Sequence, residues 1–103
     1  MTMSIKSDIF PLVIKWDEEK DRWLILRRGI SFNDIAEKII EGEYLDILEN
    51  PRKPNQDIFL IAIKGYVWVV PFVIDKDEAI FLKTAYPSRK FNKIYGGRHE
   101  KED

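Results

Sequence analysis

Three runs of β-branched and aromatic residues dominate the hydrophobic pattern of the chain. They cover residues 58–63, 66–74 and 79–86, and their composition is typical of β-strands. Lys64-Gly65 predicts a tight hairpin turn between the first two runs, because glycine readily adopts the positive φ that such a turn needs. Four charged residues, 75–78, predict the second turn. We therefore expect an antiparallel meander at the centre of the core.

Two amphipathic helices are predicted ahead of the meander. The first covers residues 17–28, where Asp17 is a suitable N-cap and Gly29 can take the left-handed conformation that ends a helix. Ser31 is a suitable N-cap for the second helix, which ends at Gly42. The apolar positions of the second helix follow the three-and-four spacing of an amphipathic helix: Phe32, Ile35, Ala36, Ile39 and Ile40.

Shorter elements complete the expected fold. Residues 10–15 and 44–48 are predicted strands, the former at the edge of the sheet, and residues 50–56 form a polar loop stiffened by two prolines. Pro71 indicates a bulge or an edge position in the middle strand of the meander.

The C-terminal part of the chain adds one more helix. Ser88 is placed to cap a short helix over residues 89–95. The order of the elements predicts an α+β domain in which two N-terminal helices pack on an antiparallel, mostly meander β-sheet, with the helices on one face.

The chain of 103 residues is long enough for one hydrophobic core, so we expect a single domain over residues 1–103, with loose polar tails at 1–8 and 97–103. No apolar run approaches the roughly 18–20 residues of a membrane span, and the N-terminus lacks the apolar region of a signal peptide. The absence of cysteine fits a reducing compartment, so we expect a cytoplasmic location.

Several classes of chemistry are excluded by residues that the sequence lacks. With no cysteine and with His99 as the single histidine, a histidine-based catalytic triad, a two-histidine metal site and a cysteine–histidine zinc site are ruled out. Neither an acidic pair at a ligand spacing nor a glycine-rich phosphate loop is present. We therefore expect no metal and no cofactor, with a metal site built from carboxylates alone as the alternative that the composition leaves open.

Charge is distributed unevenly, although the formal net charge is −1. Residues 17–49 carry ten acids against five bases, whereas residues 83–98 carry five bases and no acid. A basic segment of this kind can bind phosphate groups. The alternative is a final helix whose basic side chains are solvated and bind nothing.

Two short motifs resemble the opening of the BrnT-type toxins: residues 14–20, Ile-Lys-Trp-Asp-Glu-Glu-Lys, and residues 28–32, Arg-Gly-Ile-Ser-Phe. That family has an aromatic-Asp-x-x-Lys segment followed by a basic-Gly-Val-Ser-Phe turn into the second helix, and the similarity covers about residues 12–95. The BrnT-type family belongs to the RelE-like superfamily of small ribonuclease toxins. The resemblance implies a RelE-like fold, metal-independent endoribonuclease activity on RNA, and a cognate antitoxin, typically a DNA-binding protein.

Metal-free cleavage of RNA needs acid–base groups and a cation that stabilises the charged phosphorane. Lys83, Tyr86 and Arg89 are the candidate catalytic residues, and Tyr86 can also stack on a base. In a regular strand Lys83 and Tyr86 would face opposite sides of the sheet, and Lys83 can alternatively point to solvent. The candidate nucleic-acid-binding residues are basic or helix-capping: Ser88, Arg89, Lys90, Lys93, Lys64 and Arg52.

The sequence departs from the family pattern at two places. Such toxins usually end the third meander strand in Ser-Ala-Arg and a further basic residue, whereas residues 83–90 read Lys-Thr-Ala-Tyr-Pro-Ser-Arg-Lys. The loop at 50–56 lacks the histidine that many relatives carry. A second hypothesis therefore stays open, a non-catalytic interaction module on the same fold that binds a protein or a nucleic acid.

Overall fold

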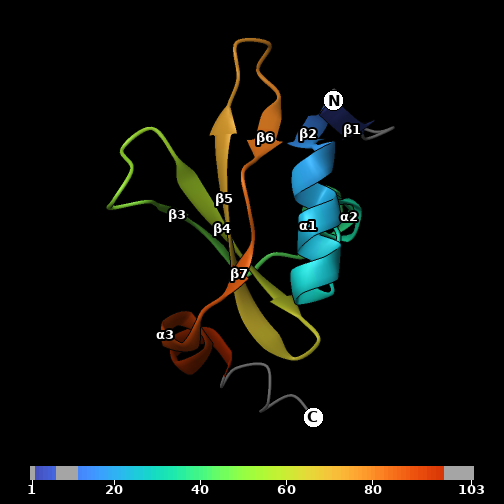
Figure 1. The fold of residues 1–103 in the computed structure, drawn as a ribbon. Helices are drawn as coiled ribbons and strands as arrows, with labels where there is room; N and C mark the ends of the chain where they lie inside the picture. The colour runs from blue at the N-terminus through green and yellow to red at the C-terminus, as the bar shows by residue number, and fades with distance from the viewer. Residues whose placement is uncertain (1, 7–11, 97–103) are drawn as a thin grey trace.

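A computed structural model describes residues 2–6 and 12–96, and the fold is α+β (Figure 1). In chain order the elements are β1 (Thr2–Lys6), β2 (Val13–Asp17), α1 (Glu18–Arg28), α2 (Phe32–Ile40), β3 (Asp46–Glu49), β4 (Asp57–Ile63), β5 (Tyr66–Ile74), β6 (Ile80–Leu82), β7 (Tyr86–Pro87), α3 (Arg89–Phe91) and the π-helical segment η1 (Asn92–Gly96).

The strands form one mixed sheet in the order β1-β2-β6-β5-β4-β3, and β7 also pairs with β5. The predicted meander of β4, β5 and β6 is confirmed, since both of its strand pairs are antiparallel. The expectation of an antiparallel sheet is wrong at one pair, because β2 lies parallel to β6. The long connection through α1, α2 and three strands allows this, since a parallel pair needs a crossover rather than a hairpin.

The N-terminal predictions need correction. Thr2–Lys6 forms β1 and pairs antiparallel with β2, so this part of the expected loose tail belongs to the sheet. The strand expected at 10–15 is β2, which begins at Val13 and is not an edge strand, because β1 and β6 flank it. Residues 7–11 and the expected C-terminal tail, 97–103, lie outside the described residues.

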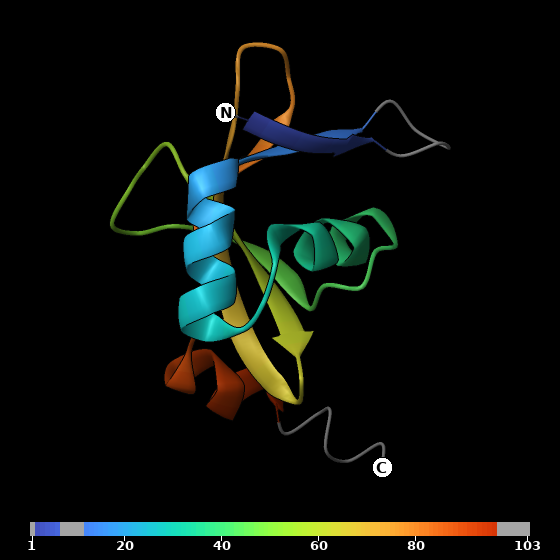
Figure 2. The ribbon, with the colours of Figure 1, turned by 45° about the vertical axis from the view of Figure 1, so that its right-hand side comes forward.

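The helices α1 and α2 cover one face of the sheet (Figure 2). Their ends follow the predicted caps: Gly29 has a left-handed φ of 70°, and the Ser31 hydroxyl accepts the N–H of Asp34. Asp17 occupies the N-cap position of α1, but its side chain accepts no capping hydrogen bond. The main core lies between these helices and the sheet, and its fully buried side chains include Ile14, Leu24, Phe32, Ile35, Ile61 and Val70.

The short C-terminal helix packs against the other face of the sheet (Figure 1). The expectation that all helices lie on one face is therefore wrong. The side chains of Ile58, Leu60, Val67 and Val69 form a second, smaller cluster there, against Leu48, Phe91 and Tyr95. The reason is that β4 and β5 are apolar on both sides, which requires cover on both faces. We call this second face the open face, because α3 and η1 cover only one end of it.

Candidate functional site

A β-bulge interrupts the pairing of β5 next to Pro71. On one side of the interruption Phe72 pairs with Leu82, and on the other side Val69 pairs with Tyr86. Two residues of β5, 70 and 71, therefore lie opposite three residues, 83–85, and this is a bulge. The sequence predicts a bulge or an edge position in the middle strand at Pro71; the bulge lies beside Pro71, but its extra residue belongs to the partner segment 83–85 and not to β5.

The bulge changes the direction of the side chains that follow it. In a regular strand Lys83 and Tyr86 would lie on opposite faces, but the extra residue brings both to the open face, where they line one cavity. Lys83 is anchored at the start of the bulge, since its N–H donates to the carbonyl of Pro71 at 2.9 Å. Proline suits this position because it has no N–H, so the interrupted ladder leaves no donor of residue 71 without a partner.

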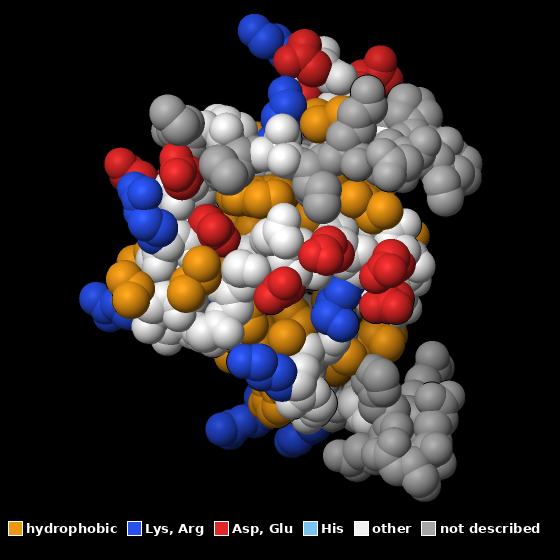
Figure 3. Space-filling view, turned by 90° about the vertical axis from the view of Figure 1, so that its right-hand side faces the viewer, with side chains coloured by type: hydrophobic (Ala, Val, Ile, Leu, Met, Phe, Trp, Pro, Cys, Tyr) orange, Lys and Arg blue, Asp and Glu red, His pale blue; other side chains and the backbone are white. Residues whose placement is uncertain are grey.

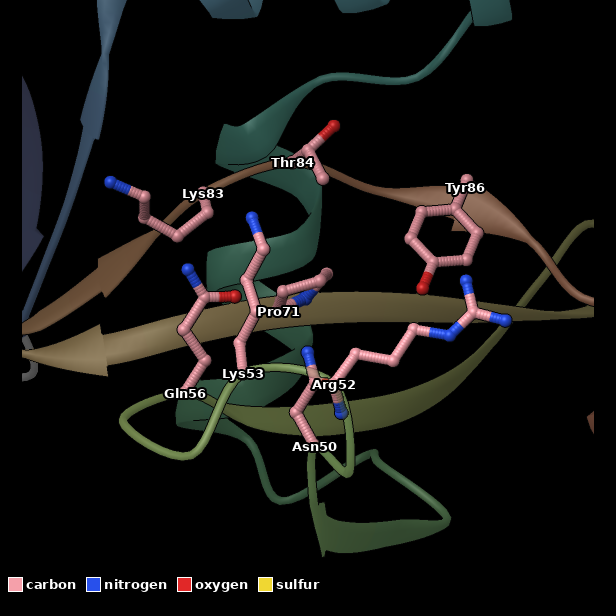
Figure 4. A pocket seen from close by; sticks show the side chains of 8 residues that line it. All are labelled: Asn50, Arg52, Lys53, Gln56, Pro71, Lys83, Thr84 and Tyr86. Atoms are coloured by element: carbon pink, nitrogen blue, oxygen red, sulfur yellow. The ribbon is translucent and has the colours of Figure 1, made fainter.

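The first cavity lies between the bulge and the loop that joins β3 to β4. Its volume is about 410 Å³. Side chains of the loop rise toward the segment 83–86 across Pro71, and the Tyr86 hydroxyl points toward the guanidinium of Arg52 (Figure 4). The lining residues are Asn50, Arg52, Lys53, Gln56, Pro71, Lys83, Thr84 and Tyr86.

A second cavity of about 310 Å³ continues from the first toward α3. The two cavities share Asn50, Arg52 and Tyr86, so together they form one depression, which we call the groove. The second cavity has an apolar floor from Ile58 and Val69. Its remaining lining residues are Glu49, Pro51, Ser88, Lys90 and Phe91.

The groove is cationic along its length. Its described lining contains four basic side chains, Arg52, Lys53, Lys83 and Lys90, against one carboxylate, Glu49. Within the described part of the chain, none of the four bases is in an ion pair. The ammonium groups of Lys83 and Lys90 lie 5.3 and 5.5 Å from neighbouring aromatic ring centroids. Such an arrangement suits an anionic ligand with several charges, above all a phosphodiester chain.

The loop at 50–56 presents its basic residues on a preformed backbone. The Asn50 side-chain oxygen accepts the N–H of Arg52 at 3.0 Å, and the N–H of Gln56 donates to the carbonyl of Lys53 at 2.9 Å. Pro51 and Pro54 restrict the backbone further. Less conformational entropy is therefore lost when the loop contacts a ligand.

The structure brings together five of the residues predicted from sequence: Lys83, Tyr86, Arg52, Ser88 and Lys90 line the groove. The Ser88 hydroxyl also caps α3, accepting the N–H of Phe91 at 3.2 Å.

Three predicted residues are not among those that line the groove. Arg89 and Lys93 are exposed in the C-terminal helical segment. Lys64 lies in the turn between β4 and β5, where its ammonium group donates to the carbonyl of Gly29 at 3.3 Å. Lys64 therefore contacts the C-terminal end of α1 instead of the groove.

Sequence reasoning did not find Asn50, Gln56 and Thr84. Polar residues are ordinary in a loop or after a strand, so their local pattern carries no signal of a site. Their convergence comes from the β3–β4 pairing and from the bulge, which are tertiary features.

Among the described residues, no group of three or more histidine, cysteine or acidic side chains is arranged to hold a metal ion. None of the described helices has the length and apolar character needed to cross a membrane.

Comparisons with protein families, with curated proteins and with solved structures gave no match to this chain. The similarity of residues 14–20 and 28–32 to the BrnT-type toxins therefore stays a prediction from sequence.

Proposed function

We propose that the chain binds single-stranded RNA along the groove and cleaves it without a metal ion, as the toxin of a toxin–antitoxin pair. The observation that carries this proposal is the continuous run of cationic side chains over two joined cavities, with Tyr86 at their junction. Single-stranded RNA offers both partners that such a groove needs, phosphates for the cations and unpaired bases for the aromatic ring.

The proposed binding mode rests on the distribution of the basic side chains over the two cavities of the groove. Lys53 and Lys83 belong to the first cavity and Lys90 to the second, while Arg52 borders both. A strand that lies along the groove would place successive phosphates near these cations, with a base against Tyr86. A mononucleotide would reach only one cavity, so affinity should rise with length until both are filled.

Cleavage would use the groups nearest the bulge. Arg52 can hold a phosphate by two parallel hydrogen bonds, and Lys83 can stabilise the charge of the phosphorane. The ribose 2′-oxygen would attack the phosphorus and lose its proton to water, while the Tyr86 hydroxyl would protonate the 5′-oxygen that leaves and would regain a proton from water. Arg89 does not line the groove, so this proposal gives it no part in the chemistry.

The partner and the biological setting are also proposals. The similarity of residues 14–20 and 28–32 to BrnT-type toxins supports a cognate antitoxin of the DNA-binding type, a RelE-like fold and a cytoplasmic site of action. Induction of the gene alone in a bacterial host should then arrest growth and degrade RNA, and co-expression with the neighbouring antitoxin gene should restore growth.

The direct test uses the purified chain, a fluorogenic single-stranded RNA and excess EDTA. Cleavage should proceed, and Tyr86→Phe, which keeps the ring and removes the hydroxyl, should slow it about 10²-fold or more. Lys83→Ala should also lose activity. The matched control is Lys76→Ala, which removes the same charge from an exposed turn outside the groove. Intact RNA after prolonged incubation of the folded chain would overturn the cleavage step.

A second function, a non-catalytic RNA-binding module, is favoured by one observation. Glu49, the carboxylate of the groove's described lining, belongs to the second cavity, whereas Lys83 belongs to the first. Glu49 and Lys83, the lysine nearest the bulge, thus do not line the same cavity and are not assembled around one phosphate. Tight binding of RNA without cleavage would support the module, and cleavage that depends on Tyr86 would exclude it.

A further inference from the structure

We propose that Arg28, which lies outside the groove, is a positioning residue that holds the bulged groove wall from the helix side of the sheet. The consequence for RNA rests on the proposed function, but the positioning itself does not. Arg28 is the last residue of α1, and the wall is the segment 83–86.

The contact joins distant parts of the chain. The Arg28 Nη1 atom donates a hydrogen bond to the carbonyl of Ala85, 57 residues away in sequence. Ala85 is fully buried in the main core, so the bond reaches the middle of the bulge. The guanidinium carbon of Arg28 also lies 4.8 Å from the ring centroid of Trp23, and this stacking fixes the side chain over the helix.

The bulge creates the need for such a donor. A bulge leaves backbone groups without ladder partners, and Pro71 on the opposite strand has no N–H to give. A buried carbonyl without a donor is costly, and a charged donor such as guanidinium makes one of the stronger hydrogen bonds available. Arg28 therefore supplies from α1 what β5 cannot supply at this point.

The geometry of the wall decides what the groove presents. Lys83 and Tyr86 flank Ala85 in the same short segment, and both line the groove on the open face. The first residue of the wall, Lys83, is held by the hydrogen bond from its N–H to the carbonyl of Pro71. The Arg28 bond holds the segment two residues further on. Loss of this second anchor should let Lys83 and Tyr86 move relative to Arg52 across the groove.

The test is amide hydrogen exchange of the full chain, followed residue by residue. In Arg28→Ala, exchange at residues 83–86 should become about tenfold faster, the factor that corresponds to about 1.4 kcal/mol. Exchange in β4 should stay within about twofold of the wild type, since a local opening does not require global unfolding. The matched control is Arg27→Ala, which removes the same charge from the same helical turn and leaves the Ala85 contact in place.

A second variant covers a failure to fold. Arg28→Lys keeps the charge and the helix propensity but loses the planar, stacked guanidinium, so it should also speed exchange at 83–86, compared with Arg27→Lys. Unchanged exchange at 83–86 in the folded Arg28 variants, or equal acceleration by the Arg27 variants, would overturn the inference.

The affinity for a fluorescein-labelled octauridylate separates this inference from the proposed function. If the wild type binds, Arg28→Ala should weaken binding about fivefold while Arg27→Ala should not, because the wall that contacts the RNA has loosened. Faster exchange with unchanged affinity would overturn the role in the groove. If the wild type does not bind RNA, the proposed function fails, and the exchange measurement alone decides the role of Arg28.

Discussion

The two faces of the sheet differ in how their surface is used. On the helix side, α1 and α2 cover the main core, and acidic side chains gather over the middle of that side (Figure 3). On the open face, α3 and η1 cover the smaller cluster at one end, and the remainder forms the cationic groove. The difference is one of cover: the helix side buries most of the apolar area, whereas the open face leaves polar and charged groups exposed along the groove.

Single residues show the contrast. Phe32 is 0% exposed on the helix side, whereas Tyr86 is 39% exposed on the open face, although both are large aromatic residues. Burial of the first ring supplies folding free energy, while the second ring keeps a surface on which a base can stack. Substitutions on the two faces should therefore have different consequences, and the following predictions test this separation.

The largest expected effect is on stability. Phe32→Ala should lower the free energy of unfolding by about 3–5 kcal/mol, because it leaves a cavity in the main core. Urea denaturation followed by tryptophan fluorescence measures the change. Tyr86→Ala is the comparison, and it should cost much less because the ring is partly exposed. Equal losses from the two substitutions would show that the faces do not differ in this way.

The next effect is on RNA affinity and compares two lysines of the C-terminal helical segment. Lys90→Ala should weaken binding about fivefold to tenfold, as expected for one lost charge-assisted contact. The same substitution should reduce the dependence of log affinity on log salt by about 0.7. Lys93→Ala is the matched control, since Lys93 does not line the groove and should leave affinity unchanged. Similar effects of both, measured by fluorescence anisotropy, would mean that general charge attracts the RNA.

A smaller effect compares the two serine caps. Ser31 caps α2 on the helix side and Ser88 caps α3 on the open face. Ser31→Ala should cost about 1 kcal/mol of global stability, measured by urea denaturation. Ser88→Ala should mainly loosen the three-residue helix beside the groove, seen as faster amide exchange at Phe91 with a smaller change in global stability. Thermal shifts of the same size in both variants would contradict this difference.

The smallest effect concerns pH and the ion pair between β2 and the β5–β6 turn. The Lys15 ammonium lies 3.2 Å from an Asp75 carboxylate oxygen. The N–H of Ala79 chiefly holds the pKa of Asp75 below its usual value, with a further contribution from Lys15. The hydrogen bond with Asp75 in turn raises the pKa of Lys15.

The signs of these shifts set the pH window. A carboxyl whose pKa is lowered by folding stabilises the protein above its unfolded pKa, and this is lost as pH falls below about 4. A lysine whose pKa is raised stabilises below its unfolded pKa, and this is lost as pH rises above about 10.5. Asp75→Asn, whose amide oxygen can still accept the turn N–H groups, should flatten the acid side of the stability profile, measured by thermal unfolding between pH 3 and 7. An unchanged acid limb would rule out this contribution.

Local rules predicted those features whose causes lie within a few residues. Gly29, Ser31 and Ser88 take their capping roles because a cap depends on the neighbouring backbone. Pro71 indicated an irregularity of the ladder because proline has no N–H to contribute, but the extra residue of the bulge lies opposite it, in residues 83–85. The predictions failed where a partner had to be chosen among strands, as in the parallel pair of β2 and β6.

The candidate site was predicted in its residue types but not in its geometry. The basic character of residues 83–90 was visible in the sequence, and Lys83, Tyr86 and Lys90 do line the groove. The partners Asn50 and Gln56 were not predicted, because loop amides become part of a site only when the fold places another segment opposite them.

The amino-acid sequence alone determined the helices, their caps, the meander and the concentration of positive charge near the C-terminus, since these depend on periodicity, composition and nearest neighbours. Only the tertiary structure decided that the loop at 50–56 faces the bulged segment 83–86, and that Arg28 holds that segment from the far side of the sheet. The physical reason is that contacts between residues distant in the chain depend on which strands pair and in which register, and a bulge of one residue changes the face on which a side chain appears.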